Sequence, residues 1–183
     1  MWYPSGAASR CRSPPERNGE AAHWSFPSCP RSAPPPVLIL GELLSSVVPV
    51  STDAERRALF ALDRIVVVGC SSTPGKEAHE IPCYLREHGY EVVPVNPFAD
   101  EIFGDRTYDS LAAVPGAIDV VLVFRPSDEL VAIVEVAIER DDVTALWTQR
   151  GIRDAKAVRT AEDAGISVVH DECIRSTHRR LVR

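Results

Sequence analysis

The sequence predicts an α/β fold in which about five or six parallel strands form a doubly wound sheet with helices on both faces. Short apolar runs alternate with helical patterns along most of the chain, the runs are largely apolar on both faces, and glycines follow two of the helical patterns. Strands of this kind are typical of a parallel sheet that is covered on each side. Alternating strands and helices also imply right-handed crossovers.

Residues 1–47 differ from the rest of the chain. Nine of the fifteen prolines fall within the first fifty residues, where neither helical nor strand periodicity is present. The apolar run Val37–Leu40 is too short to span a bilayer, so we expect no membrane association. We expect residues 1–47 to be a disordered tail or an over-extended reading frame, and residues 48–183 to form the folded domain.

The domain begins with a helix-start signal and continues with five strand patterns. Thr52 and Glu55 have the spacing of a capping box, and Ala58, Leu59 and Leu62 would share one face of the short helix that follows. The strands are predicted at Arg64–Val68, Glu91–Val95, Asp119–Phe124, Val143–Trp147 and Ile166–Val169.

Four more helices are predicted between and after these strands. They are Glu77–His88, Ser127–Arg140, Arg153–Ala164 and Glu172–Leu181. Pro82 should delay or bend the first of them, and Ser127 should cap the second. Gly89 and Gly165 occupy positions that commonly follow a helix C-terminus. The whole pattern is Rossmann-like.

Charge and composition exclude several classes of protein. The net charge of −6 argues against broad nucleic-acid binding, which needs a basic face, but it permits a small phosphorylated ligand. The five cysteines form neither a CxxC pair nor a zinc ligand set. We therefore expect no metal site and a reducing, cytoplasmic location.

The turn after the first strand carries the first candidate binding residues. In a doubly wound sheet, ligands bind beyond the carboxyl ends of the strands. Gly69, Cys70 and Ser71 follow the strand, and Lys76 leads into the next helix, so backbone amides, hydroxyls and one cation could meet a phosphate. The turn is neither a GxGxxG motif nor a P-loop, because Ser71 and Pro74 replace two glycines of the first and Cys70 a glycine of the second. An ordinary strand-to-helix turn is the alternative.

The second strand ends in Val95, Asn96 and Pro97. Val95 and Pro97 could flank an adenine, and Asn96 could bind the ribose or the base. An NAD-binding fold would have Asp or Glu in place of Asn96. A rigid strand exit is the alternative.

The third and fourth strands end in further polar groups. Arg125 follows Phe124 and could pair bidentately with a phosphate, although a surface ion pair or a helix cap would also explain it. Gln149 could line the same cleft, whereas we expect Trp147 to lie in the core.

Together these strand ends resemble those of the small stand-alone CoA-binding domain proteins, whose fold is related to the nucleotide-binding domain of the succinyl-CoA synthetase α subunit. The resemblance runs from about Asp63 to Leu181. It rests on Val68-Gly69-Cys70-Ser71, Pro74-Gly75-Lys76, His88-Gly89-Tyr90, Pro94-Val95-Asn96-Pro97, Val123-Phe124-Arg125, Trp147 with Gln149 and Gly151, and Asp171 with Cys173.

The resemblance implies that coenzyme A lies across the strand ends. The phosphates would meet Gly69, Ser71 and Lys76, with Cys70 beside them. Val95, Asn96 and Pro97 would hold the adenosine, and Phe124 with Arg125 would close the other side. Lys76 stands where the family frequently has arginine, which keeps the charge but loses the planar fork.

The sequence contains no recognisable catalytic apparatus. It has no GxSxG nucleophile elbow and no carboxylate pair placed for acid–base chemistry. A dyad of Cys173 and His178, or a mixed disulfide between Cys70 and the thiol of CoA, are the catalytic and redox alternatives.

We therefore expect a non-catalytic module that binds CoA or an acyl-CoA, with a homo-oligomer as an open option. An NAD(P)-linked oxidoreductase and an interaction protein on a vestigial Rossmann scaffold are the other two functions that the sequence allows. The missing third glycine and the missing ribose acid count against the oxidoreductase.

Overall fold

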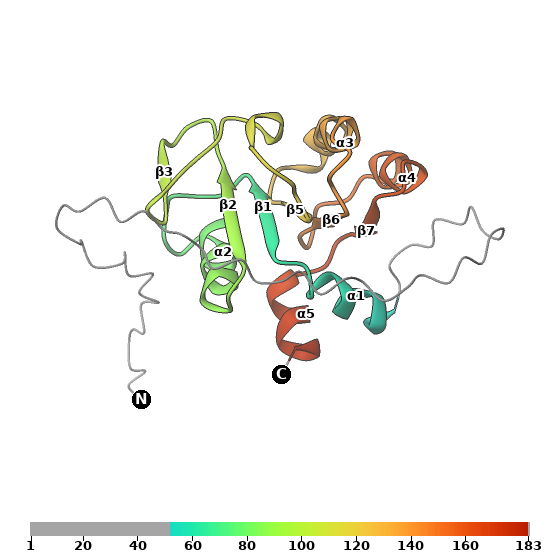
Figure 1. Cartoon of the computed structure of the whole chain (residues 1–183), viewed down its shortest axis with the longest axis horizontal. Coiled ribbons are helices and arrows are strands. Elements are labelled where there is room, and N and C mark those ends of the chain that lie inside the picture. The colour runs from blue at the N-terminus through green and yellow to red at the C-terminus, as the bar shows by residue number, and fades with distance from the viewer. Residues whose placement is uncertain (1–51, 183) are drawn as a thin grey trace, which may run out of the picture. The chain divides into compact units, whose positions relative to one another are not determined.

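The structure is a computed structural model that describes residues 52–182, so the predicted tail at residues 1–47 lies outside the described residues. Its centre is a five-stranded parallel sheet in the order β2-β1-β5-β6-β7 (Figure 1). The strands are β1 (Arg64–Val68), β2 (Glu91–Val95), β5 (Val120–Val123), β6 (Ala145–Thr148) and β7 (Ser167–Val169). The predicted fold class and the five predicted strands are confirmed.

Helices cover both faces of this sheet (Figure 1). One face carries α1 (Asp53–Leu59), α2 (Glu77–Glu87) and α5 (Ile174–Leu181), and the other carries α3 (Leu130–Glu139) and α4 (Ala155–Asp163). Alternate residues of each strand point to opposite faces. Ile65 and Val67 therefore pack in the first layer and Val66 in the second, and all three are buried. None of the helices within residues 52–182 is long and apolar enough to cross a bilayer.

The sequence patterns missed two small elements between β2 and β5. One is the hairpin of β3 (Glu101–Ile102) and β4 (Asp105–Arg106), and the other is a short 3₁₀ turn, η1 (Leu111–Ala113). Two-residue strands are too short to show periodicity. The hairpin turn also places Phe103 at φ 61° and Gly104 at φ 83°, so an aromatic residue stands where Asn or Asp is the usual sequence signal.

Two local predictions are wrong. Ser127 does not cap a helix, because it lies in the 3₁₀ turn η2 (Ser127–Glu129), and its hydroxyl accepts from the Arg153 amide at 3.0 Å. Ala58 is exposed, so the buried side of α1 consists of Leu59 with the half-buried Leu62. The contact between Ser127 and Arg153 joins residues that are 26 positions apart, and the local pattern contains no sign of it.

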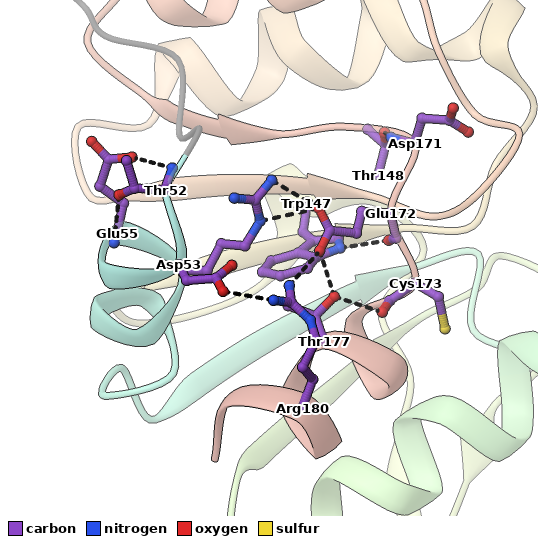
Figure 2. Close-up of polar contacts among 11 residues, drawn as sticks. Thr52, Asp53, Glu55, Trp147, Thr148, Asp171, Glu172, Cys173, Thr177 and Arg180 are labelled. Carbon is purple, nitrogen blue, oxygen red and sulfur yellow. Dashed lines mark hydrogen bonds and ion pairs between the residues drawn. The ribbon is translucent and has the colours of Figure 1, made fainter.

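α1 is fixed to the start of α5 by polar contacts (Figure 2). The predicted capping box is present, with the Thr52 hydroxyl and the Glu55 carboxylate each accepting from the other residue's amide. Arg56 forms an ion pair with Glu172 at 2.9 Å. The buried Trp147 indole donates to the Glu172 carbonyl at 2.7 Å, which confirms that Trp147 belongs to the core.

Pro82 lies inside α2 and links this helix to the loop after β1. Because proline has no N–H, the carbonyl four residues earlier, that of Ala78, lacks its usual helical donor. The Ser71 amide donates to that carbonyl at 2.9 Å. α2 nevertheless begins at Glu77, so Pro82 does not delay the helix, and the carbonyl that it leaves without a helical donor becomes an attachment point for the loop.

Candidate functional site

A cleft of about 250 Å³ lies at the carboxyl ends of the strands. The loops after β1, β2 and β5 supply its walls, and β2 and β5 lie on opposite sides of β1. The cleft is therefore at the point where the strand order reverses, which is where doubly wound sheets bind ligands. Its lining residues are Gly69, Cys70, Ser71, Lys76, Ala78, Asn96, Pro97, Phe98 and Arg125.

Seven of the nine residues predicted to bind the ligand are brought together in this lining, and their contact with a ligand stays a prediction. The two others are not among the lining residues: Val95 is buried in β2, and Phe124 packs against the core on the α2 side. The sequence patterns missed Ala78 and Phe98. Phe98 is 87% exposed. The sequence signal that could have identified it is an aromatic residue directly after Asn96-Pro97, where the chain leaves β2.

The loop after β1 is held in shape by hydrogen bonds of its own. The Ser71 amide donates to the Ala78 carbonyl, and the Ser71 carbonyl contacts His79 Nδ1 at 2.8 Å. The Ser71 hydroxyl accepts from the Thr73 amide at 3.1 Å. The Gly75 amide donates to the Glu80 carboxylate at 2.9 Å. These amides are occupied within the protein and do not face a ligand.

The donors that remain for a phosphate lie at the start of α2. The first amides of a helix have no intrahelical partner, and their partial positive charge favours an anion. Lys76 occupies the N-cap position and makes no side-chain cap to these amides. Within residues 52–182 no hydrogen bond or ion pair engages the Lys76 side chain. An anion in the cleft would thus meet one ammonium group and the amides of Glu77 and Ala78.

Asn96 connects the two loops that form the β1–β2 side of the cleft. Its Nδ2 donates to the Cys70 carbonyl at 2.8 Å, and its Oδ1 accepts from the Phe98 amide at 2.8 Å. The sequence led us to expect ribose or base binding by this side chain. The structure shows a bracing role, which leaves one N–H and one lone pair for any ligand.

Arg125 crosses closely over Gly69 on the opposite wall. Gly69 has φ +87°, and a Cβ there would lie 2.8 Å from Arg125 Cδ. The Arg125 guanidinium donates through Nε and Nη2 to both carboxylate oxygens of Glu129, at 2.7 and 2.6 Å. Hydrogen bonding and the negative charge of Glu129 raise the pKa of Arg125, so the guanidinium is both charged and oriented at the cleft.

Neither cysteine alternative gains support from the geometry. Burial raises the pKa of the Cys70 thiol to about 12, which keeps it protonated and a poor nucleophile at neutral pH. His178 is buried, and its Nδ1 pairs with the Tyr84 hydroxyl at 2.9 Å. The ring is enclosed by the aromatic side chains of Phe60, Tyr84, His88 and Tyr90.

Known proteins match the same part of the chain. A family model described as a CoA binding domain matches residues 63–179. The uncharacterized protein YneT of Bacillus subtilis is 36% identical over 115 residues, which cover 63% of this chain and 84% of YneT. A solved structure from Thermus thermophilus is 37% identical, with a TM-score of 0.68 over 72% of this chain and 99% of that chain.

A longer relative shares only this unit. Acetate–CoA ligase (ADP-forming) II of Archaeoglobus fulgidus is 29% identical over 109 residues. The match covers 58% of this chain but only 15% of the ligase.

Proposed function

Because the chain belongs to the CoA binding domain family, we propose that it binds coenzyme A or an acyl-CoA in the cleft at the carboxyl ends of β1, β2 and β5. The observation that carries the proposal is the convergence of two cations, Lys76 and Arg125, on a cleft that begins at the N-terminus of α2. A diphosphate needs such an arrangement of positive charge and unpaired amides.

The lining residues suggest how the ligand would be oriented. Its phosphates would lie between Lys76 and Arg125, next to the first amides of α2. The adenosine would lie on the β2 side, where Pro97 and the exposed ring of Phe98 offer apolar surface. The remaining arm of the cofactor would then leave the cleft on the β5 side.

We propose that this domain binds the cofactor without performing chemistry on it. The Cys70 thiol beside the cleft is held protonated by burial, and the His178 ring is enclosed by aromatic side chains at the α2–α5 contact. The ligase relative carries its matching segment within a much longer chain, which supports the role of a binding module.

Thermal denaturation with CoA, acetyl-CoA, NAD and NADPH in parallel tests the proposal. A ligand that binds only the folded state adds about 2.7 kcal/mol of stability at one hundred times its Kd. We expect CoA or acetyl-CoA to raise Tm and both nicotinamide cofactors to leave it unchanged. Stabilisation by NADPH alone would refute CoA binding and support the oxidoreductase alternative.

The two lysines of the chain provide a matched pair of variants. Lys76 lines the cleft, whereas Lys156 is exposed on α4 and away from it. Both substitutions to alanine remove one positive charge from a surface position. We expect Lys76→Ala to weaken CoA binding about tenfold or more and Lys156→Ala to have no effect. An equal effect of the two variants would mean that Lys76 does not contact the ligand.

A further inference from the structure

The charged side chains of α4 are arranged against the dipole of the helix. Acidic groups stabilise a helix near its N-terminus and basic groups near its C-terminus, and α2 follows this rule in its first and last turns. α4 has no acidic residue in its first turn and no basic residue in its last. Instead Lys156 and Arg159 come first, and Glu162 and Asp163 come at the end. The helix therefore carries an unfavourable charge order in a single chain.

These four charged groups are also unpaired within the part of the chain that the structure describes. Arg159 is three residues from Glu162 and four from Asp163, and both spacings allow ion pairs on one helix. None of the ion pairs within residues 52–182 engages any of the four side chains. Their charges are thus available to groups outside residues 52–182.

The four side chains share the outer face of α4. Successive residues of an α-helix are about 100° apart, and the buried Ala157 and Ala161 mark the inner side. All four charged residues then lie within about 60° of the opposite direction. A hollow of about 400 Å³, lined among others by Ala155, Val158 and His170, borders this face. His170 follows the edge strand β7, so the hollow lies at the end of the sheet, on the side of α4 away from α3 (Figure 1).

We propose that a second copy of this chain binds to the outer face of α4, with the two α4 helices antiparallel about a two-fold axis at the level of Thr160. The basic half of each helix then faces the acidic half of the other. With a rise of 1.5 Å per residue, Lys156 lies within about 1.5 Å, along the helix axis, of the partner's Asp163, and Arg159 lies equally close to the partner's Glu162. The two-fold axis forms each of these pairs twice.

The charge order selects this partner and this orientation. A parallel copy would bring like charges together, and a uniformly acidic or basic partner would match only half of the helix. Antiparallel helices also align their dipoles favourably, which offsets the charge order that is unfavourable in one chain. Ala155 and Val158 supply small and apolar side chains for the contact. α4 connects β6 with β7, whereas the loops of the cleft follow β1, β2 and β5, so the inference does not depend on CoA binding.

Sedimentation velocity of the full chain at increasing concentration tests the inference on the wild type. We expect a species with twice the mass of one chain at micromolar concentration. Because the proposed contacts are exposed ion pairs, raising the salt concentration from about 0.05 M to about 0.5 M should weaken dimerisation at least tenfold. A single-chain mass at every concentration would overturn the proposal, and so would a dimer that salt does not weaken.

Two variants with opposite charge on α4 give a sharper test. Lys156→Glu with Arg159→Glu makes the outer face acidic, and Glu162→Lys with Asp163→Lys makes it basic. Each variant repels its own copy, so we expect its dimerisation to be at least about tenfold weaker than that of the wild type. An equimolar mixture of the two should form a dimer again. This recovery requires folded chains, so a variant that merely unfolds cannot produce it.

Matched charge changes on α3 separate the α4 face from the net charge of the chain. Glu135 and Glu139 are exposed on α3, and replacing both by lysine changes the net charge as much as the basic α4 variant does. We expect this control to dimerise like the wild type. Three results would place the interface elsewhere and overturn the proposal: unchanged dimerisation of both α4 variants, a mixture that stays monomeric although each variant unfolds cooperatively on heating, or an equal loss in the α3 control.

Discussion

Replacing Gly69 by alanine tests whether the close approach of Arg125 shapes the cleft. Gly69 has φ +87°, a conformation that costs an alanine about 1 kcal/mol. The added Cβ would also lie 2.8 Å from Arg125 Cδ and 3.3 Å from the Phe124 carbonyl carbon. The arginine stem would have to move, and its ion pair with Glu129 would be lost.

Gly165 is the matched control for this substitution. It has the same φ of +87°, but a Cβ there would meet nothing within 4 Å, and it lies after α4 rather than at the cleft. Gly165→Ala should therefore cost about 1 kcal/mol, or about 4 °C in Tm for a domain of this size. The Arg125–Glu129 pair is partly exposed and worth only about 0.5 kcal/mol, so with the steric displacement Gly69→Ala should cost about 2 kcal/mol, or about 8 °C.

Thermal denaturation measures the effect of each substitution on stability, and titration calorimetry with CoA measures its effect on affinity. The displaced guanidinium should lose a charge-assisted contact with the phosphates, which lowers the affinity of Gly69→Ala at least tenfold. Gly165→Ala should bind CoA like the wild type. Equal losses of Tm in both variants, with unchanged affinity, would show that the contact between Gly69 and Arg125 has no role in the cleft.

Four substitutions test how individual side chains contribute to stability. Thr52→Ala should cost about 1 kcal/mol in urea denaturation, because it removes half of the capping box of α1. Asn96→Ala should lower the Tm of the ligand-free protein by an amount equivalent to about 2 kcal/mol, because two hydrogen bonds are lost, whereas Lys76→Ala should leave that Tm unchanged. Burial, and secondarily the charge of His88, lower the pKa of His178, so the folded state binds this proton less well than the unfolded state. Stability should therefore decline as the pH falls below about 6.5, and denaturation followed against pH should show a smaller decline in His178→Gln.

The sequence was sufficient for the sheet because its signals are local. Runs such as Arg64–Val68 and Glu91–Val95 are β-branched on both faces, and their bounds agree with the structure residue for residue. Ligands bind where parallel strands end at one edge of a sheet, and the binding residues were predicted from this rule. Seven of the nine predicted residues line one cleft. Val95 does not line the cleft because it is still part of β2, where its side chain is buried in the core.

The hydrogen bonds of the cleft could not be predicted in the same way. The contact of Asn96 with the Cys70 carbonyl joins residues that are 26 positions apart, and it depends on the exact approach of two loops. The link between Ser71 and Ala78 depends on a carbonyl that Pro82 leaves without a donor. Such pairings follow from the tertiary arrangement, so a pattern of residue types does not encode them.

The polar groups of the site fall into two classes with different consequences for binding. Ser71 and Asn96 use their hydrogen bonds within the protein, which fixes the loops before a ligand arrives and lowers the entropic cost of binding. Lys76 forms the second class, because no other described residue engages its ammonium group. Substitutions in the first class should therefore reduce Tm and affinity together. In the second class affinity should fall while Tm is unchanged, and this difference identifies a residue that is kept for its ligand rather than for the fold.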